Sequence, residues 1–166
     1  MAGTSIIQGD YRYIGTLSMQ TLSIPAGTIL NAAVNANADI GVAKLRHLHS
    51  ITYGANGSAA SVTIPIHCSY AAGMIKAVKA GSIVACIGDS TVTVDVLKNG
   101  VSVLTAVITL DSANTARIAE DGTLDSGEVT LAVDDLLEIV IVATVGTGTL
   151  ATGPFVDVVV EELGAP

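Results

Sequence analysis

Residues 91–110 constrain the fold more than any other part of the chain. Their sequence, TVTVDVLKNGVSVLTAVITL, consists of two arms rich in β-branched residues, with Asn99 and Gly100 between them. Asn-Gly tolerates the positive φ angles of a type I′ turn, which is a favoured connection in a two-residue β-hairpin. In the first arm valines alternate with more polar residues, the pattern of a strand with one buried face. The stretch therefore predicts a hairpin in an antiparallel sheet.

The chain from residue 45 onward carries further strand patterns. Turn residues (Gly, Asn and Asp) separate eight or nine segments at spacings near ten residues, which is typical of a sandwich or jelly roll. Because the chain has one Phe, four Tyr and no Trp, the core must be aliphatic. The last segment is apolar on both faces, which predicts core on one side and a subunit interface on the other. The predicted strands are residues 45–53, 61–69, 74–85, 91–98, 101–110, 115–119, 128–133, 136–145 and 155–162.

Residues 1–44 differ from this pattern and predict an extended N-terminal arm. The arm mixes Ser, Thr and Gly with isolated apolar residues, and its later part is rich in Ala and Asn. Such a composition buries little apolar surface by itself, so we expect the arm to become ordered on another surface. Asp39 is a candidate cap for a short helix running to about Leu48, although Gly41 weakens it. We therefore predict an arm over residues 1–44, with this candidate helix near its end, and a β-sandwich (jelly-roll) domain over residues 45–166.

Charge divides the chain unevenly. Residues 1–83 hold five basic and two acidic residues, a net of +3, whereas residues 84–166 hold two basic and thirteen acidic residues, a net of −11; together they give −8. An acidic body repels phosphates, so no nucleic-acid partner is expected. Neither a secretion signal nor an apolar run of the roughly 20 residues of a membrane helix is visible, so no membrane partner is expected.

The two cysteines, Cys68 and Cys86, are 18 residues apart and lie in apolar surroundings. No metal-binding spacing of cysteines is present. They are predicted to be buried free thiols of a reducing cytoplasm, with a disulfide as the less favoured alternative.

Three of these segments resemble small jelly-roll proteins of tailed phages and prophages. They are TVTVDVLKNGVSVL (residues 91–104), LAVDDLLEI (residues 131–139) and GTGTLATG (residues 146–153). The last of these segments precedes an apolar strand. ADIGVAKLRHLH (residues 38–49) is similar to the linker that precedes that domain. The resemblance covers roughly residues 38–162 and leaves the arm before them uncovered.

The resemblance implies a head-decoration (cement) protein, a structural virion protein that reinforces a phage capsid. Proteins of this kind lie on the outer capsid surface, commonly as trimers, and bridge neighbouring capsid subunits. The implied partners are the major capsid protein and two further copies of the chain. The resemblance also implies that the protein is made in the host cytoplasm. Three arms on one trimer would bind with an avidity gain on the order of 10²–10⁴.

Partner-binding candidates follow from the arm's composition. Large amphipathic and apolar side chains are the usual anchors of an interface. The alternative is that the arm's tyrosines pack on its own domain. The candidates are Tyr11, Arg12, Tyr13, Leu17, Ile24 and Ile29.

No catalytic or cofactor-binding residue is predicted, and the chain is not expected to be an enzyme. His47 and His49 share one face of a strand and are weak metal candidates, which His67 could approach; structural histidines are the favoured interpretation. The acidic clusters at residues 120–125 and 134–138 are interpreted as turn and surface carboxylates, because calcium-loop spacing and aromatic sugar platforms are lacking.

Two other functions remain open. A tail-fibre or baseplate adhesion module would recognise a host receptor through loops such as residues 111–114 and 146–153. A jelly-roll enzyme of the cupin type would need His47 and His49 together with a carboxylate, yet no acidic residue follows His49 until Asp89.

Overall fold

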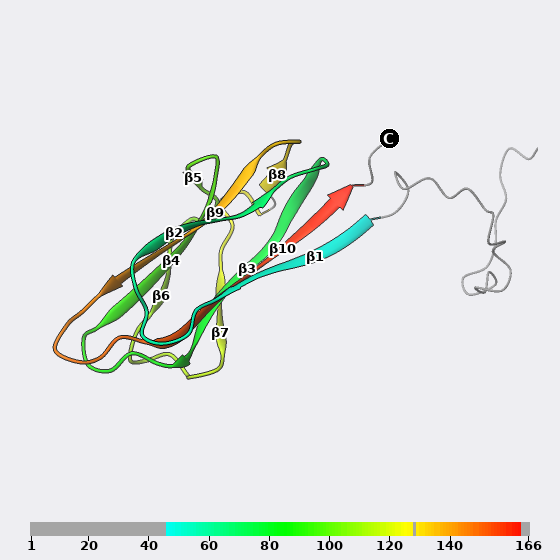
Figure 1. Cartoon of the computed structure of the whole chain (residues 1–166). Coiled ribbons are helices and arrows are strands. Elements are labelled where there is room, and N and C mark those ends of the chain that lie inside the picture. Colours follow the sequence, from blue (N-terminus) through cyan, green and yellow to red (C-terminus); the bar gives the residue numbers. More distant parts are fainter. Residues whose placement is uncertain (1–45, 128, 164–166) are drawn as a thin grey trace, which may run out of the picture. The chain divides into compact units, whose positions relative to one another are not determined.

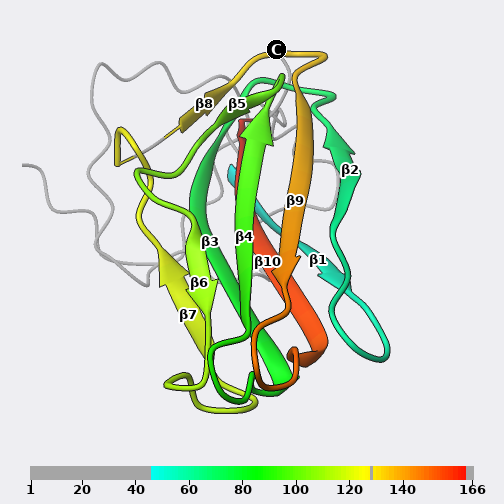
Figure 2. The same ribbon diagram turned by 90° about the vertical axis from the view of Figure 1, so that its left-hand side faces the viewer.

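The computed structural model describes residues 46–127 and 129–163, which form an all-β sandwich of two antiparallel sheets (Figures 1 and 2). These residues belong to the second of the two units into which the chain divides, residues 40–166. The predicted all-β sandwich is confirmed. Its strands are β1 (Arg46–Gly54), β2 (Val62–Cys68), β3 (Gly73–Val84), β4 (Thr91–Lys98), β5 (Val101–Ser102), β6 (Ile108–Leu110), β7 (Ala119–Gly122), β8 (Val129–Leu131), β9 (Leu136–Thr144) and β10 (Thr152–Leu163).

The strand order is that of a jelly roll. The first sheet has the order β1-β10-β3-β7, and β8 also pairs with β3; the second has the order β2-β9-β4-β5, and β6 also pairs with β4. If β5 with β6, and β7 with β8, are each counted as one interrupted strand, eight strands remain, as in a double-sheet jelly roll. Figure 2 shows β1 and β2 along one side of the sandwich and β6 and β7 along the other.

Alternation along the central strands builds the core. Side chains at every second position point between the sheets, and the residues between them face outward. The burial of these aliphatic side chains is the main favourable term in folding. The fully buried residues include Val92, Val94 and Val96 of β4, Leu137, Ile139 and Ile141 of β9, and Val156, Val158 and Val160 of β10. In β3, Ile75 and Val78 are both fully buried because the register with β10 shifts between them.

The hairpin turn is the one predicted from the sequence. Asn99 has a φ of 51° and Gly100 a φ of 81°, both in the left-handed region that an Asn-Gly turn supplies. Lys98 and Val101 are register partners on either side of this turn. Local chemistry was therefore enough to predict the β4–β5 connection.

The second arm of that hairpin is not one strand over residues 101–110, as predicted, but two short strands. Val103 and Leu104 are both buried, so the alternation of inward and outward side chains fails there. Leu104 forms an isolated bridge with Leu124, which draws this part of the chain away from β4. The predicted strand was wrong because this contact is long-range.

Other boundaries also differ from the predictions. Residues 115–118 form a loop, and β7 begins only at Ala119; Asn114 accepts a hydrogen bond from the backbone N–H of Asp111, and Arg117 has a φ of 68°. The candidate helix does not reach Leu48, because Leu48 lies in β1 opposite Glu161 of β10. In the described ranges no helix is long and apolar enough to cross a membrane.

Candidate functional site

The six partner-binding candidates of the arm lie outside the described residues. They are Tyr11, Arg12, Tyr13, Leu17, Ile24 and Ile29. The functional side chains that the structure describes therefore belong to the sandwich.

His47 and His49 lie on the inward face of β1, near its first residues. His49 is the register partner of Val160, which is fully buried, and His47 is the partner of Glu162. The two imidazole rings are stacked, with centroids 6.1 Å apart and planes inclined by 27°. Because the inward face at this end extends past the aliphatic core, the rings are exposed rather than enclosed.

A β-bulge brings the third histidine to the same place from the opposite sheet. In β2 the register with β9 shifts between Pro65 and His67, so that His67 lies opposite the fully buried Leu137. Without the bulge, alternation from Val62 through Ile66 would turn His67 outward. Re-aiming one side chain is a recognised effect of a bulge.

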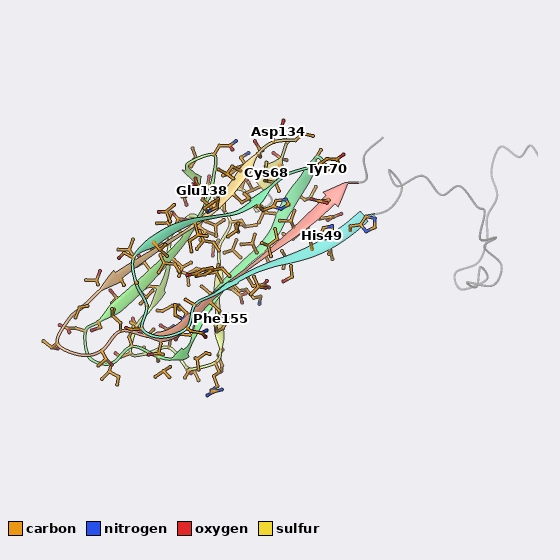
Figure 3. The ribbon with its side chains drawn as sticks, viewed as in Figure 1. His49, Cys68, Tyr70, Asp134, Glu138 and Phe155 are labelled. Carbon is orange, nitrogen blue, oxygen red and sulfur yellow. The ribbon has the colours of Figure 1, made fainter. Side chains whose placement is uncertain are left out.

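Two of these histidines contact one carboxylate, and His47 stacks on one of the two. Glu162 on β10 has its Oε2 atom 3.4 Å from Nε2 of His49 and its Oε1 atom 3.6 Å from Nε2 of His67. His67 Nε2 is buried and makes no hydrogen bond. Figure 3 shows His49 and Cys68, the neighbour of His67, at the same end of the sandwich, and Phe155 toward the other end.

This histidine–glutamate cluster can form ion pairs across the two sheets. The carboxylate lies between two imidazoles, with one oxygen toward each. Within residues 46–127 and 129–163, no three His, Cys, Asp or Glu side chains converge as metal ligands. The sequence identified His47 and His49 as sharing a face, but Glu162 was missed, because only its register with β1 reveals it.

Asp135 organises the turn between β8 and β9. It accepts hydrogen bonds from the backbone N–H of Ala132 (2.8 Å) and the amide of Asn99 (2.6 Å), and Lys98 Nζ is 3.9 Å away. These hydrogen bonds, followed by the charge of Lys98, lower the pKa of Asp135, while desolvation opposes them. Asp134, its neighbour, has a φ of 69° and is exposed. Asp135 thus links the β4–β5 and β8–β9 turns.

Asp89 links two loops in a similar way at the opposite end of the sandwich. It accepts hydrogen bonds from the hydroxyl (2.8 Å) and the backbone N–H of Thr147. These two bonds lower the pKa of Asp89. The loop at residues 146–153, one of the two loops proposed for adhesion, is therefore tied to the loop between β3 and β4.

A polar row crosses the outward face of the first sheet. Asp157 of β10 accepts hydrogen bonds from the hydroxyls of Ser50 and Thr52 on β1, the latter at 3.0 Å. Lys79 of β3, the register partner of Asp157, forms a 2.7 Å ion pair with Asp121 of β7. The hydrogen bond and charge of Asp121, with a smaller effect from Asp157, raise the pKa of Lys79. Such exposed pairs contribute little to stability.

Both cysteines are free, but only one is buried. Cys86 is buried, with its Sγ 3.4 Å from the carbonyl of Leu110 and 3.2 Å from the N–H of Ala151. Cys68 was predicted to be buried and is exposed, because it lies on the outward face of the edge strand β2.

Exposed apolar side chains gather at the end of the sandwich opposite the histidines. They come from the end of β3, the β3–β4 loop, the loop before β7 and the loop after β9. We call this set the apolar loop end. Sequence reasoning missed it, because its residues come from four separate segments of the chain. The set is Ile83, Val84, Ile87, Ile118 and Val145.

The fold and these side chains define a jelly-roll sandwich with a carboxylate held between two histidines at one end and apolar loops at the other. No family model matches the chain, and no curated protein matches it.

Several solved structures are similar to it at low identity. The C-terminal domain of EclA, described as a sugar-binding protein, is 14% identical over 85% of this chain and 89% of that one, with a TM-score of 0.34. A structure of the Gx strain of infectious bursal disease virus is 14% identical over 73% of this chain, with a TM-score of 0.31. The VP2 subviral particle of the same virus is 15% identical over 74% of this chain, with a TM-score of 0.29. The chain spans less than two fifths of each viral chain, and likenesses this distant carry no argument about function.

Proposed function

We propose that the chain is a structural virion protein that decorates a phage capsid, bridging capsid subunits from the outside as a homotrimer. The observation that carries the proposal is the jelly-roll strand order found for residues 46–163, in a chain whose strand segments resemble phage head-decoration proteins. A double-sheet body with a fully buried aliphatic core supplies stiffness.

In this proposal the N-terminal arm binds the capsid. Forty-five residues precede β1, among them Tyr11, Arg12 and Tyr13. Tyr and Arg are the side chains most enriched at the energetic centres of interfaces. The body, which carries most of the chain's negative charge, faces outward.

A full-length variant with Tyr11→Ala and Tyr13→Ala tests the arm. Purified capsids that lack the protein are incubated with each variant, and bound protein is quantified after sedimentation. We expect the double variant to bind at least about tenfold more weakly, since each interface anchor contributes on the order of 1–2 kcal/mol. Deletion of residues 1–37 should abolish binding and leave the far-UV circular dichroism of the β body unchanged.

Tyr70→Ala is the matched control, because Tyr70 is a tyrosine of the body and is 89% exposed. It should bind capsids as the wild type does. If the variant that lacks residues 1–37 binds capsids as the wild type does, the arm is not the capsid-binding segment.

A second candidate is a tail-fibre or baseplate adhesion module that binds a host receptor. The apolar loop end favours it, because exposed clusters of large apolar side chains mark interaction surfaces. Replacing Ile87 and Val145 by Ser tests this candidate: loss of cell binding without loss of capsid binding would favour adhesion. Electron microscopy of virions would separate the two, with density over the head for decoration and at the tail for adhesion.

A further inference from the structure

The first residues of β1 are held by few side-chain contacts. His47, Leu48, His49 and Ser50 are all exposed, and Leu48 is 67% exposed. Farther along β1, Ile51 and Tyr53 pack against the core. The start of β1 is therefore secured mainly by its backbone pairing with β10, which places it at the low end of local stability.

The histidine–glutamate cluster lies at this weakly held end. β1 is an edge strand of the first sheet and β2 an edge strand of the second. The two strands are joined through residues 55–61 at the other end of the sandwich, so that here the sheet edges are separate. Glu162 contacts His49 of β1 and His67 of β2 at 3.4 and 3.6 Å, and thus connects these separate edges.

We propose that Glu162, between His49 and His67, is a pH-dependent clamp that holds the start of β1 and the end of β10 against the end of β2. In this clamp a protonated imidazole on either side is attracted to one oxygen of the ionised carboxylate. The proposal does not depend on the function proposed above.

The sign of the pH dependence follows from the chemistry of the two groups. An imidazole ordinarily takes up its proton below about pH 6.5, and a glutamic acid ordinarily loses its proton above about pH 4.3. Both charges are present between these values. The clamp is lost as the pH rises through the histidine range, and also as the pH falls through the carboxyl range. The clamp therefore holds only where an imidazole and the carboxylate are charged at the same time.

Other charged groups around the cluster do not reverse this sign. His47 stacks on His49 and, when both are protonated, repels it, which weakens the β1 side of the clamp. Lys98 and Asp135, at the β4 and β9 ends, face each other at 3.9 Å and offset one another. Lys76 and Glu161 contact each other at 3.6 Å on the opposite face of the first sheet.

Amide hydrogen exchange of the full-length protein at pH 5.5 and pH 8.0 tests the clamp. Protection factors, corrected for the intrinsic effect of pH, are compared for the start of β1, the end of β2 and the central amides of β10. In the wild type we expect about 2- to 10-fold greater protection at pH 5.5 for the first two regions, the range set by two partly exposed ion pairs. The central amides of β10 report global stability and give the reference.

Glu162→Gln keeps the shape of the side chain and removes its charge, so it should abolish the local pH difference. Glu138→Gln is the matched control, because Glu138 is a half-buried glutamate on β9 that lies between the inward-facing Leu137 and Ile139 and therefore on the outward face; it should keep the difference. His67→Gln should remove the effect at β2 and leave part of it at β1. Equal protection at both pH values in the wild type, or an unchanged difference in Glu162→Gln, would overturn the proposal.

Discussion

Truncation of Ile139 tests the assignment of the two faces of β9, on which the sandwich depends. Ile139 is fully buried and lies between Ile64 of β2 and Val96 of β4 in the second sheet. Ile139→Ala removes three carbon atoms, which at about 0.8 kcal/mol for each buried methylene amounts to about 2.4 kcal/mol. The cavity left in a close-packed core adds to this value, so we expect a total loss of about 3–4 kcal/mol in the free energy of unfolding.

Two companion variants show how large a loss in the free energy of unfolding to expect from smaller changes. Ile139→Val removes one methylene and should cost about 0.5–1.5 kcal/mol. Val142→Ala changes an outward-facing residue of the same strand that is 45% exposed, and should cost less than about 1 kcal/mol. Urea unfolding followed by far-UV circular dichroism gives each free energy, and similar slopes across the three variants would show that they compare the same transition. Equal losses for Ile139→Ala and Val142→Ala would refute the assigned inward and outward faces.

Three further predictions concern the turns and the thiols. Gly100→Ala should destabilise the protein by about 1 kcal/mol, measured by urea unfolding, because Gly100 has a φ of 81° that alanine adopts at a cost although the space around it is open. The pKa of Asp135 is lowered in the folded state, so its stabilising effect is present above about pH 4 and is lost as the pH falls through the folded pKa. The free energy of unfolding should therefore fall less steeply on acidification in Asp135→Asn than in the wild type. Equal slopes of this free energy against pH would contradict the prediction. A thiol reagent should label Cys68 rapidly and Cys86 only after unfolding, and rapid labelling of both in the native protein would contradict the buried position of Cys86.

The histidine–glutamate cluster shows where sequence reasoning stops. The spacing of His47 and His49 places them on one strand face, because the side-chain period of a strand is two. Their stacking and inward orientation agree with that inference. The approach of His67 requires the bulge in β2, and the place of Glu162 requires the register of β10 against β1. Neither the bulge nor the register is a local property of the chain.

The hairpin and the broken strand after it show the same division. Local residues determined the turn at Asn99 and Gly100, since positive φ angles depend on the side chains present there. The same reasoning wrongly extended one strand over residues 101–110, because the bridge between Leu104 and Leu124 joins segments twenty residues apart.

The sequence by itself determined the all-β class, the aliphatic core and most strand positions, because period-2 alternation and turn residues act within a few residues of one another. Only the tertiary structure decided which strands are neighbours, which side chains the bulges re-aim, and that one glutamate lies between two histidines of opposite sheets. The physical reason is that register and sheet order depend on the packing of segments far apart in the chain, whose contacts leave no mark on the pattern of either segment alone.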